Sequence, residues 1–125
     1  MSISVLVLCE IASFRQPIQE MVAEIGHVSL LASNDEYATE ILTAIHVDVC
    51  MVFTDKGRNH ISKVAEQLRK AQALLPIIAP RDMATDTDDP KLDIPISVPF
   101  TSAVLDQTIR MAKAIKIVAY YNKRD

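Results

Sequence analysis

The stretch Val47-Asp-Val-Cys-Met-Val-Phe53 is apolar at every position except Asp48. Nearly continuous aliphatic runs of this kind are typical of strands in parallel sheets, which helices cover on both faces. The pattern therefore predicts a central parallel strand. Parallel neighbours need crossover connections, so helical segments are expected on either side of it.

Toward the N-terminus, the run from Ser4 to Cys9 has the same aliphatic character and predicts another buried strand. Ser13 and Gln16 resemble a capping box for a helix that follows this strand, with Pro17 in its first turn. The apolar period of this helix ends at Gly26, which is predicted to stop it.

A short strand is predicted at Val28 to Ala32, and Ser33 with Glu36 predicts the start of a second helix. After the central strand, Asn59 is expected to cap a third helix. Aliphatic runs then predict a fourth strand at Leu75 to Ala79 and a fifth at Ile94 to Val98.

The segment from Arg81 to Asp93 carries five aspartates and almost no apolar periodicity, so it predicts a solvated acidic loop in place of a fourth helix. A long last helix is expected from Ser102 to Tyr121. Strands that alternate with helices predict an α/β fold, specifically a three-layer, doubly wound, five-stranded parallel sheet. Residues 1–125 are predicted to form one domain.

The composition excludes several functions. The net charge is -3 and the basic residues are dispersed, so no nucleic-acid partner is expected. The two glycines, Gly26 and Gly57, are too few for a glycine-rich phosphate cradle. The apolar runs are too short to span a bilayer, so a cytoplasmic protein without a membrane partner is expected. Cys9 and Cys50 are predicted to be buried free thiols.

A family resemblance rests on residues spread along the whole chain. Gly26 closes the first helix, Tyr37-Ala38 lies in the second, and Leu75-Pro-Ile-Ile-Ala79 forms the fourth strand. Ser97-Val-Pro-Phe100 then precedes Leu105. This ordered set resembles the receiver domain of bacterial response regulators. The resemblance implies a flavodoxin-like fold whose strand tips hold a magnesium-binding acidic pair, a phosphorylated aspartate, a Ser or Thr, and a lysine before a proline.

The sequence departs from that family at nearly every functional position. Cys9-Glu10 stands at the acidic pair, Phe53 at the phosphorylated aspartate, Arg81 near the Ser or Thr, and Val98 at the lysine. Phosphoryl capture needs a carboxylate nucleophile and a cation that holds the product. We therefore expect a degenerate pocket of Cys9, Glu10, Phe53, Asp55, Arg81 and Val98, with no cofactor.

Two features of this pocket stay open in the sequence. A slip of two residues would bring Asp55 to the tip of the third strand as phosphoacceptor, and Glu10 and Asp55 are the candidates for any metal ligand. The alternative is that Asp55-Lys56-Gly57 simply forms a turn, since these residue types favour turns. Glu10 and Arg81 are the candidates for an ion pair that would lock the pocket, with an ordinary solvated pair as the alternative.

An enzymatic alternative begins at Cys9. Cys9 and Arg15 have the C-x5-R spacing at a strand-to-helix turn and resemble the phosphate loop of low-molecular-weight tyrosine phosphatases, with Asp89 before Pro90 as the acid. The intervening residues contain no glycine, and Glu10 beside the thiol would raise its pKa and repel phosphate. The three histidines, His27, His46 and His60, lie at segment edges, where solvated or capping roles are expected.

The last helix is apolar over about half its circumference, more than one core contact requires. A protein-interaction face is therefore predicted on Val104, Thr108, Met111, Ile115, Val118 and Tyr121. The sequence as a whole predicts a stand-alone, degenerate receiver-like signalling protein that acts by phosphorylation-independent contact. The expected partner is a histidine kinase, another regulator, or a second copy in a homodimer through the last helix.

Overall fold

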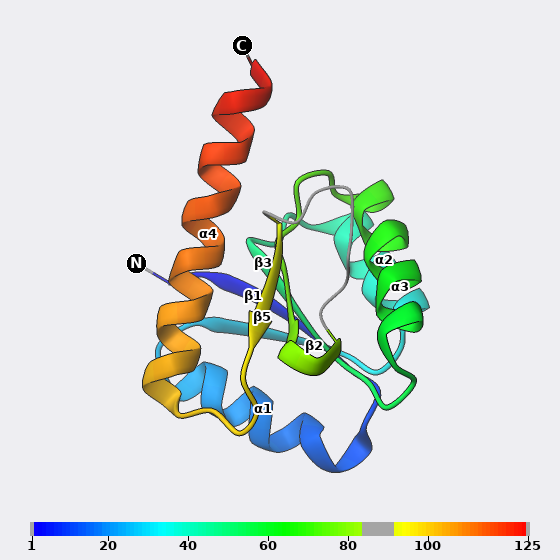
Figure 1. Ribbon diagram of the computed structural model, residues 1–125, viewed down its shortest axis with the longest axis vertical. Helices are drawn as coiled ribbons and strands as arrows, with labels where there is room; N and C mark the ends of the chain where they lie inside the picture. Colours follow the sequence, from blue (N-terminus) through cyan, green and yellow to red (C-terminus); the bar gives the residue numbers. More distant parts are fainter. Residues whose placement is uncertain (1, 84–91, 125) are drawn as a thin grey trace.

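The computed structural model describes residues 2–83 and 92–124 (Figure 1). Strands and helices alternate along the described chain, as the sequence predicts. The elements are β1 (Ser4–Cys9), α1 (Ala12–Glu24), β2 (Val28–Ala32), α2 (Asp35–Ala44), β3 (Val49–Phe53), α3 (Arg58–Ala71), β4 (Ile77–Pro80), the 3-10 turn η1 (Arg81–Met83), β5 (Asp93–Ile96) and α4 (Ser102–Arg124).

The five strands form one parallel sheet in the order β2-β1-β3-β4-β5. The predicted central strand, β3, lies in the middle of the sheet and is buried at every position. This burial explains its uninterrupted apolar sequence, because helices cover both of its faces. The predicted fold class, a doubly wound three-layer α/β sheet, is confirmed.

Two apolar cores lie on opposite faces of the sheet. On one face, α1 and α4 pack against alternate strand residues such as Val7, Met51 and Phe53. On the other face, α2 and α3 pack against the intervening residues, including Leu8 and Cys50. Successive strand residues point to opposite faces, so a run without polar interruptions fills both cores.

Gly26 ends α1, as predicted. It has a positive φ of 89°, and its N–H donates to the carbonyl of Ala23 while the N–H of His27 donates to the carbonyl of Val22. These two bonds make a Schellman motif, which satisfies the last carbonyls of the helix and needs a left-handed residue. Glycine adopts that conformation without the steric cost that a Cβ would impose.

The predicted starts of three helices are wrong. The residue before α1 is Ile11, which makes no capping bond from its side chain, so Ser13 and Gln16 lie inside the helix and Pro17 lies in its second turn. Asn34, not Ser33, caps α2 by accepting from the Tyr37 N–H at 2.8 Å. Gly57 stands before α3, which begins at Arg58. The residues before α1 and α3 make no side-chain cap, so a nearby residue with a capping side chain does not fix where these two helices begin.

The connection between β4 and β5 contains η1 in its first residues, and most of the predicted acidic loop lies outside the described residues. Both strands also differ from their predicted limits, since β4 ends at Pro80 and β5 at Ile96. The Arg69 guanidinium links the chain just before β4 to the start of β5. It donates to the carbonyls of Leu75 and Leu92 and to the side chain of Asp93.

The last helix, α4, is 23 residues long and extends three residues beyond the predicted end. At 1.5 Å per residue it spans about 34 Å, and its final turns project beyond the sheet (Figure 1). No helix in the described ranges is long and apolar enough to cross a membrane.

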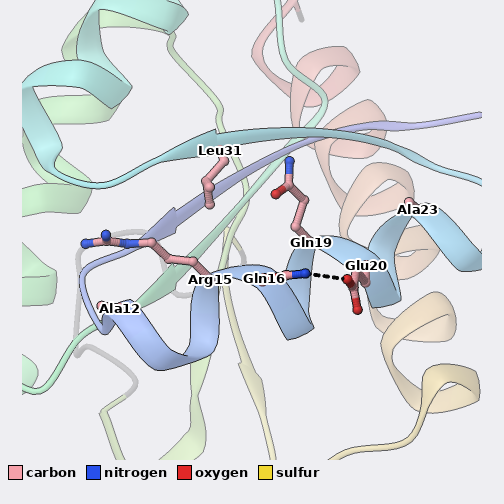
Figure 2. A pocket seen from close by; sticks show the side chains of 7 residues that line it. All are labelled: Ala12, Arg15, Gln16, Gln19, Glu20, Ala23 and Leu31. Carbon is pink, nitrogen blue, oxygen red and sulfur yellow. Dashed lines mark hydrogen bonds between the residues drawn. The ribbon is translucent and has the colours of Figure 1, made fainter.

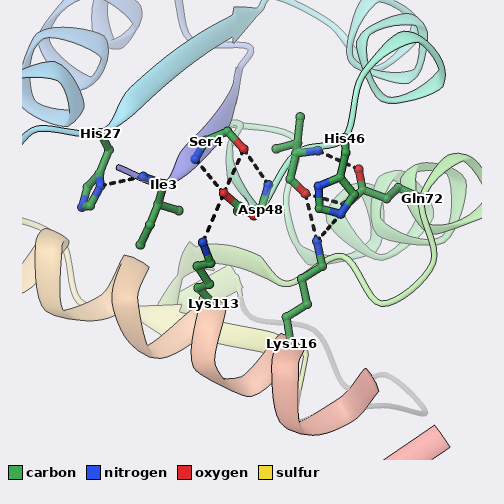
Figure 3. Close-up of polar contacts among 9 residues, drawn as sticks. Ile3, Ser4, His27, His46, Asp48, Gln72, Lys113 and Lys116 are labelled. Atoms are coloured by element: carbon green, nitrogen blue, oxygen red, sulfur yellow. Dashed lines mark hydrogen bonds and ion pairs between the residues drawn. The ribbon is translucent and has the colours of Figure 1, made fainter. Parts of the chain in front are cut away.

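Polar side chains anchor α4 to the amino-terminal edge of the sheet (Figure 3). Lys113 Nζ lies 3.8 Å from Asp48 Oδ2, which also accepts from the backbone and hydroxyl of Ser4. One turn later, Lys116 donates to the carbonyl of Val47 and lies 2.8 Å from His46 Nε2. These contacts fix the rotation of α4 about its axis.

Candidate functional site

The ends of β1 and β3 lie side by side at the carboxyl edge of the sheet. Cys9 pairs with Phe53 in the strand register, and the N–H of Glu10 donates to the carbonyl of Phe53 at 2.8 Å. Residues that follow these strands therefore share one edge. The structure thus brings Cys9, Glu10 and Phe53 together, as the sequence predicts, and Asp55 follows as an exposed residue.

The Glu10 carboxylate is held by two cationic or proton-bearing partners. Its Oε1 lies 2.6 Å from His60 Nε2 and its Oε2 lies 3.1 Å from Lys56 Nζ. The Glu10 side chain is only 8% exposed. Burial acts to raise the pKa of Glu10, but the hydrogen bonds from Lys56 and His60 outweigh it and hold the pKa below its ordinary value. Glu10 is therefore an ionised carboxylate whose charge is balanced from within the chain.

Thr54 completes this cluster. It is buried, its hydroxyl accepts from the Lys56 N–H at 3.1 Å, and it also contributes a hydrogen bond to Glu10. We define the cluster as Glu10, Thr54, Lys56 and His60. Sequence reasoning missed Lys56 and His60 as partners. Lys56 lies in the β3–α3 connection and His60 in the first turn of α3, and no local pattern signals their contact with Glu10, because it depends on the side-by-side pairing of β1 and β3.

The predicted ion pair between Glu10 and Arg81 is wrong. Arg81 lies in η1 after β4, and its Nε donates to the Ser97 hydroxyl at 3.2 Å. Arg81, Ser97 and Val98 line a small pocket of about 180 Å³ with Pro80 and Asp82. Glu10 takes Lys56 from the β3–α3 connection and His60 from the first turn of α3 instead, because the chain after β3 passes directly beside the end of β1.

Phe53 ends β3 within an apolar environment. Its side chain is 4% exposed, and its ring centroid lies 6.2 Å from that of Phe100. Next to it is a groove of about 210 Å³ that is lined by apolar residues: Phe14, Pro17, Ile18, Met21, Phe53, Val98, Pro99 and Phe100. This surface suits an apolar side chain, and it offers no cationic group to a phosphoryl oxygen.

The geometry around Cys9 does not suit a phosphatase loop. Only Glu10 and Ile11 separate β1 from α1, so the Cys9 thiol donates to the nearby carbonyl of Ile11 at 3.3 Å. Burial raises the pKa of Cys9, which keeps the thiol protonated and weakens it as a nucleophile. Arg15 donates to the backbone carbonyl of Cys9, and Asp89 lies outside the described residues.

Arg15 belongs instead to an open groove between α1 and β2 (Figure 2). This groove has a volume of about 560 Å³, and its polar wall includes Gln16 and Glu20, which hydrogen-bond to each other at 2.9 Å. Leu31 forms part of the opposite wall. The Arg15 side chain thus lies between α1 and β2 and is bonded to the end of β1.

The predicted interaction face on α4 divides into two sets. Val104, Met111, Val118 and Tyr121 are exposed, between 43% and 59%. Thr108 is buried and its hydroxyl donates to the Val104 carbonyl, while Ile115 packs against the core beside α1. The inclusion of Thr108 and Ile115 in an exposed face is therefore a wrong prediction. They lie on the side of the helix that turns toward the sheet.

His27 and His60 depart from the solvated or capping roles that the sequence predicts, whereas His46 is exposed. His27 is buried, its Nδ1 accepts the Ile3 N–H, and its Nε2 lies 2.7 Å from Asp106. His60 binds Glu10, and His46 is exposed beside Lys116 (Figure 3). Within residues 2–83 and 92–124, no three His, Cys, Asp or Glu side chains gather in an arrangement that could hold a metal ion.

No family model matches the sequence, and no curated protein matches it. Among solved structures, a response regulator receiver domain protein from Clostridium thermocellum has a TM-score of 0.69 at 19% identity, covering 92% of this chain and 97% of that one.

Two further structures agree. The receiver domain of sensor histidine kinase PA1611 from Pseudomonas aeruginosa PAO1, with a magnesium ion in its active site cleft, has a TM-score of 0.70 at 14% identity, covering 91% of this chain and 99% of that one. NtrX from Brucella abortus, in complex with ADP, has a TM-score of 0.72 at 12% identity, covering 100% of this chain and 30% of NtrX. The chain therefore has the fold of response-regulator receiver domains.

Proposed function

We propose that this protein is a degenerate receiver domain that acts in two-component-type signalling through protein–protein contact, without phosphorylation of an aspartate. The observation that carries the proposal is the position of Phe53. It ends β3, where the receiver resemblance places the phosphorylated aspartate, and it packs against Phe100 beside an apolar groove. An aromatic ring cannot act as the nucleophile in acyl-phosphate formation.

The Glu10 cluster supports the same proposal. The receiver resemblance implies a magnesium site here, but the residues present do not fit one. Glu10 is committed to Lys56 and His60, and Asp55 is exposed. Lys56 and His60 balance the charge of the Glu10 carboxylate and favour its ionised form, which a divalent cation would otherwise do.

Output in this proposal comes from the exposed side of α4. Val104, Met111, Val118 and Tyr121 form an apolar surface on a helix that is already fixed to the sheet. Exposed apolar surfaces on soluble domains often mark protein-binding sites. The partner in this proposal is a histidine kinase, another regulator or a second copy of the chain.

The proposal is tested by incubating the protein with Mg²⁺ and acetyl phosphate and measuring the intact mass, and by recording amide NMR spectra with Mg²⁺ and beryllofluoride. A receiver domain that has the aspartate serves as the positive control. We expect no phosphoryl adduct and no shifts around β3 and β4. A stable adduct in the wild type that is absent in Asp55→Asn would overturn the proposal and assign Asp55 as phosphoacceptor.

A further inference from the structure

β2 leaves a row of backbone hydrogen-bonding groups open at one edge of the sheet. It pairs with β1 on its inner side, where the Val28 N–H donates to the Ile3 carbonyl. Successive residues of a parallel strand direct their backbone groups to opposite sides, so Ser29 and Leu31 direct theirs away from β1. Within the part of the chain that the structure describes, no other segment hydrogen-bonds to these groups. An open edge of this kind is a template for a further strand.

A proline blocks the opposite edge of the sheet. β5 forms that edge, and the Leu92 carbonyl just before it accepts from the Ile77 N–H on the inner side. The same alternation directs the backbone of Pro95 outward, where proline has no N–H to offer. Proline on an edge strand prevents further pairing. β2 contains neither a proline nor a charged residue, so it has no such block.

An apolar wall stands on one side of the β2 edge. α2 packs on β2, and Thr39 Oγ1 accepts from Gln67 of α3, which marks the side of α2 that faces α3. Tyr37 and Ile41 lie two residues from Thr39, about 200° around the helix, so they face away from α3 and toward the open edge. Tyr37 is 51% exposed, and Ile41 is partly buried with Leu30 of β2. These side chains can contact apolar groups of an added strand.

A polar groove lies on the other side of the same edge (Figure 2). Leu30 packs against the core beneath α2, whereas Leu31 packs against the core beneath α1, so β2 separates the two sides. The groove runs between α1 and β2, and its lining includes Leu31, Gln19 and Glu20. The open edge is therefore apolar on the side of α2 and polar on the side of α1.

From this arrangement we infer that the β2 edge binds an extended segment of a partner protein, which joins the sheet as a further strand. The segment alternates apolar residues with lysine or arginine. Successive side chains of a strand point to opposite sides, so the apolar ones contact the α2 wall and the basic ones face the α1 groove. Backbone hydrogen bonds to Ser29 and Leu31 hold the segment, as in other complexes that extend a sheet. This surface is distinct from the exposed side of α4, so the inference goes beyond the proposed function.

The charges around the edge favour a basic segment. Arg15 is the only basic residue of α1 and α2, and its Nε donates to the carbonyl of Cys9. Glu20 is the carboxylate that lines the groove. Complementary charges increase the rate of encounter and exclude partners of like charge. The acidic residues of the two flanking helices are Glu20, Glu24, Asp35, Glu36 and Glu40.

NMR titration of the full chain with a synthetic peptide tests the inference. The probe alternates valine and lysine over about nine residues, which is within the usual length of a strand. We expect saturable shifts of the Ser29 and Leu31 amide signals. Hydrogen exchange of these two N–H groups should slow when the peptide is bound, because each gains an acceptor. Absence of saturable shifts in β2 at millimolar peptide overturns the inference.

Two control peptides test the chemistry of the segment. One alternates valine and glutamate, which keeps the strand pattern and reverses the charge. The other places all its lysines before its valines, which keeps the charge and removes the alternation. Each should bind about tenfold more weakly than the probe or worse. Equal binding of the glutamate peptide overturns the basic character of the segment, and equal binding of the block peptide overturns its addition as a strand.

Two tyrosines provide a matched pair of variants. Tyr37 and Tyr120 are both 51% exposed, but Tyr120 lies on α4. Tyr37→Ala should weaken binding of the probe about fivefold or more, because the apolar wall loses its largest exposed side chain. Tyr120→Ala should bind the probe like the wild type. Wild-type affinity in Tyr37→Ala, or an equal loss in both variants, overturns the site.

Ser29→Pro tests the backbone contact, because it removes an outward N–H as Pro95 does at the other edge. Circular dichroism establishes that this variant is folded, and Tyr37→Ala decides the site if it is not. Folded Ser29→Pro should lose binding of the probe, and retention of wild-type affinity overturns strand addition. A phosphoryl adduct on Asp55 would overturn the proposed function without changing peptide binding, so the two failures are distinguishable.

Discussion

His27 Nε2 lies 2.7 Å from Asp106 Oδ1, and this contact ties the turn before β2 to the first turns of α4 across 79 residues of sequence. The Ile3 N–H donates to Nδ1 of the same ring, so Nδ1 is unprotonated and Nε2 carries the proton that is shared with Asp106. The His27 side chain is 1% exposed. The His27 ring thus joins the start of β1 to the last helix.

Removing the His27 ring should destabilise the fold. His27→Ala leaves the buried Ile3 N–H without an acceptor, which costs about 1–3 kcal/mol. Arg110→Ala removes the exposed partner of Asp106 and should cost less than about 1 kcal/mol, because solvent screens exposed ion pairs. Urea denaturation followed by circular dichroism measures both. Equal effects of the two variants would contradict a structural role for His27.

The environment of Phe53 predicts a large difference between two phenylalanines. Phe53→Ala should lower the free energy of unfolding by about 3–5 kcal/mol, because it leaves a cavity beside Phe100 in the core. Phe14→Ala, on the exposed wall of the groove, should cost less than about 1 kcal/mol. Thermal and urea denaturation provide the comparison. A small loss in Phe53→Ala would show that the end of β3 is not packed as described.

The Glu10 cluster predicts unequal roles for its two partners. His60→Ala removes the hydrogen bond to the buried Oε1 of Glu10 and should cost about 1–3 kcal/mol. Lys56→Ala should cost less than about 1 kcal/mol, because the Lys56 side chain is 57% exposed. The double variant Glu10→Gln with His60→Ala should have the same free energy of unfolding as His60→Ala alone, measured by urea denaturation. This result is expected because the two residues act as a unit.

Stability should fall in acid through specific carboxylates. Burial acts to raise the pKa of Asp48, but hydrogen bonds from Ser4 and the charges of Lys113 and Lys116 hold it below its ordinary value, and the pKa of Glu10 is likewise lowered. The unfolded chain binds protons more readily at these sites, with ordinary values near ~4. Their stabilising contribution is therefore present above that value and is lost as pH falls through the folded pKa values.

Melting temperatures between pH 3 and pH 7 measure this effect. Asp48→Asn should flatten the profile relative to the wild type, because the amide does not titrate. Asp55→Asn is the matched control, since Asp55 is exposed and follows the same strand. A profile that is equally steep in Asp48→Asn and in the wild type would contradict the assignment.

The two thiols should be unreactive while the protein is folded. Burial raises the pKa of Cys9, and it raises the pKa of Cys50 to about 12, so little thiolate exists at neutral pH. We expect slow reaction with Ellman's reagent in buffer and rapid reaction of both thiols in urea. A thiol at Cys9 that reacts rapidly in the folded protein would revive the phosphatase interpretation.

The sequence alone determined the order of strands and helices, the presence of a central strand within Val47 to Phe53, and the end of α1 at Gly26. These features depend on local periodicity and on backbone conformations that few residues tolerate, so the pattern of neighbours is enough to predict them. It also placed Phe53 at the end of β3, because the apolar run stops there, although β3 begins at Val49 and not at Val47.

Only the tertiary structure decided which side chains meet. Lys56 and His60 reach Glu10 because parallel pairing sets the end of β3 beside the end of β1, and His27 reaches Asp106 because α4 packs on the same face as α1. The sequence predicts one interaction face on the last helix. Packing divided it, since burial of Leu105 and Ile109 fixes the rotation of α4, turns Thr108 and Ile115 inward and leaves Met111 and Val118 exposed.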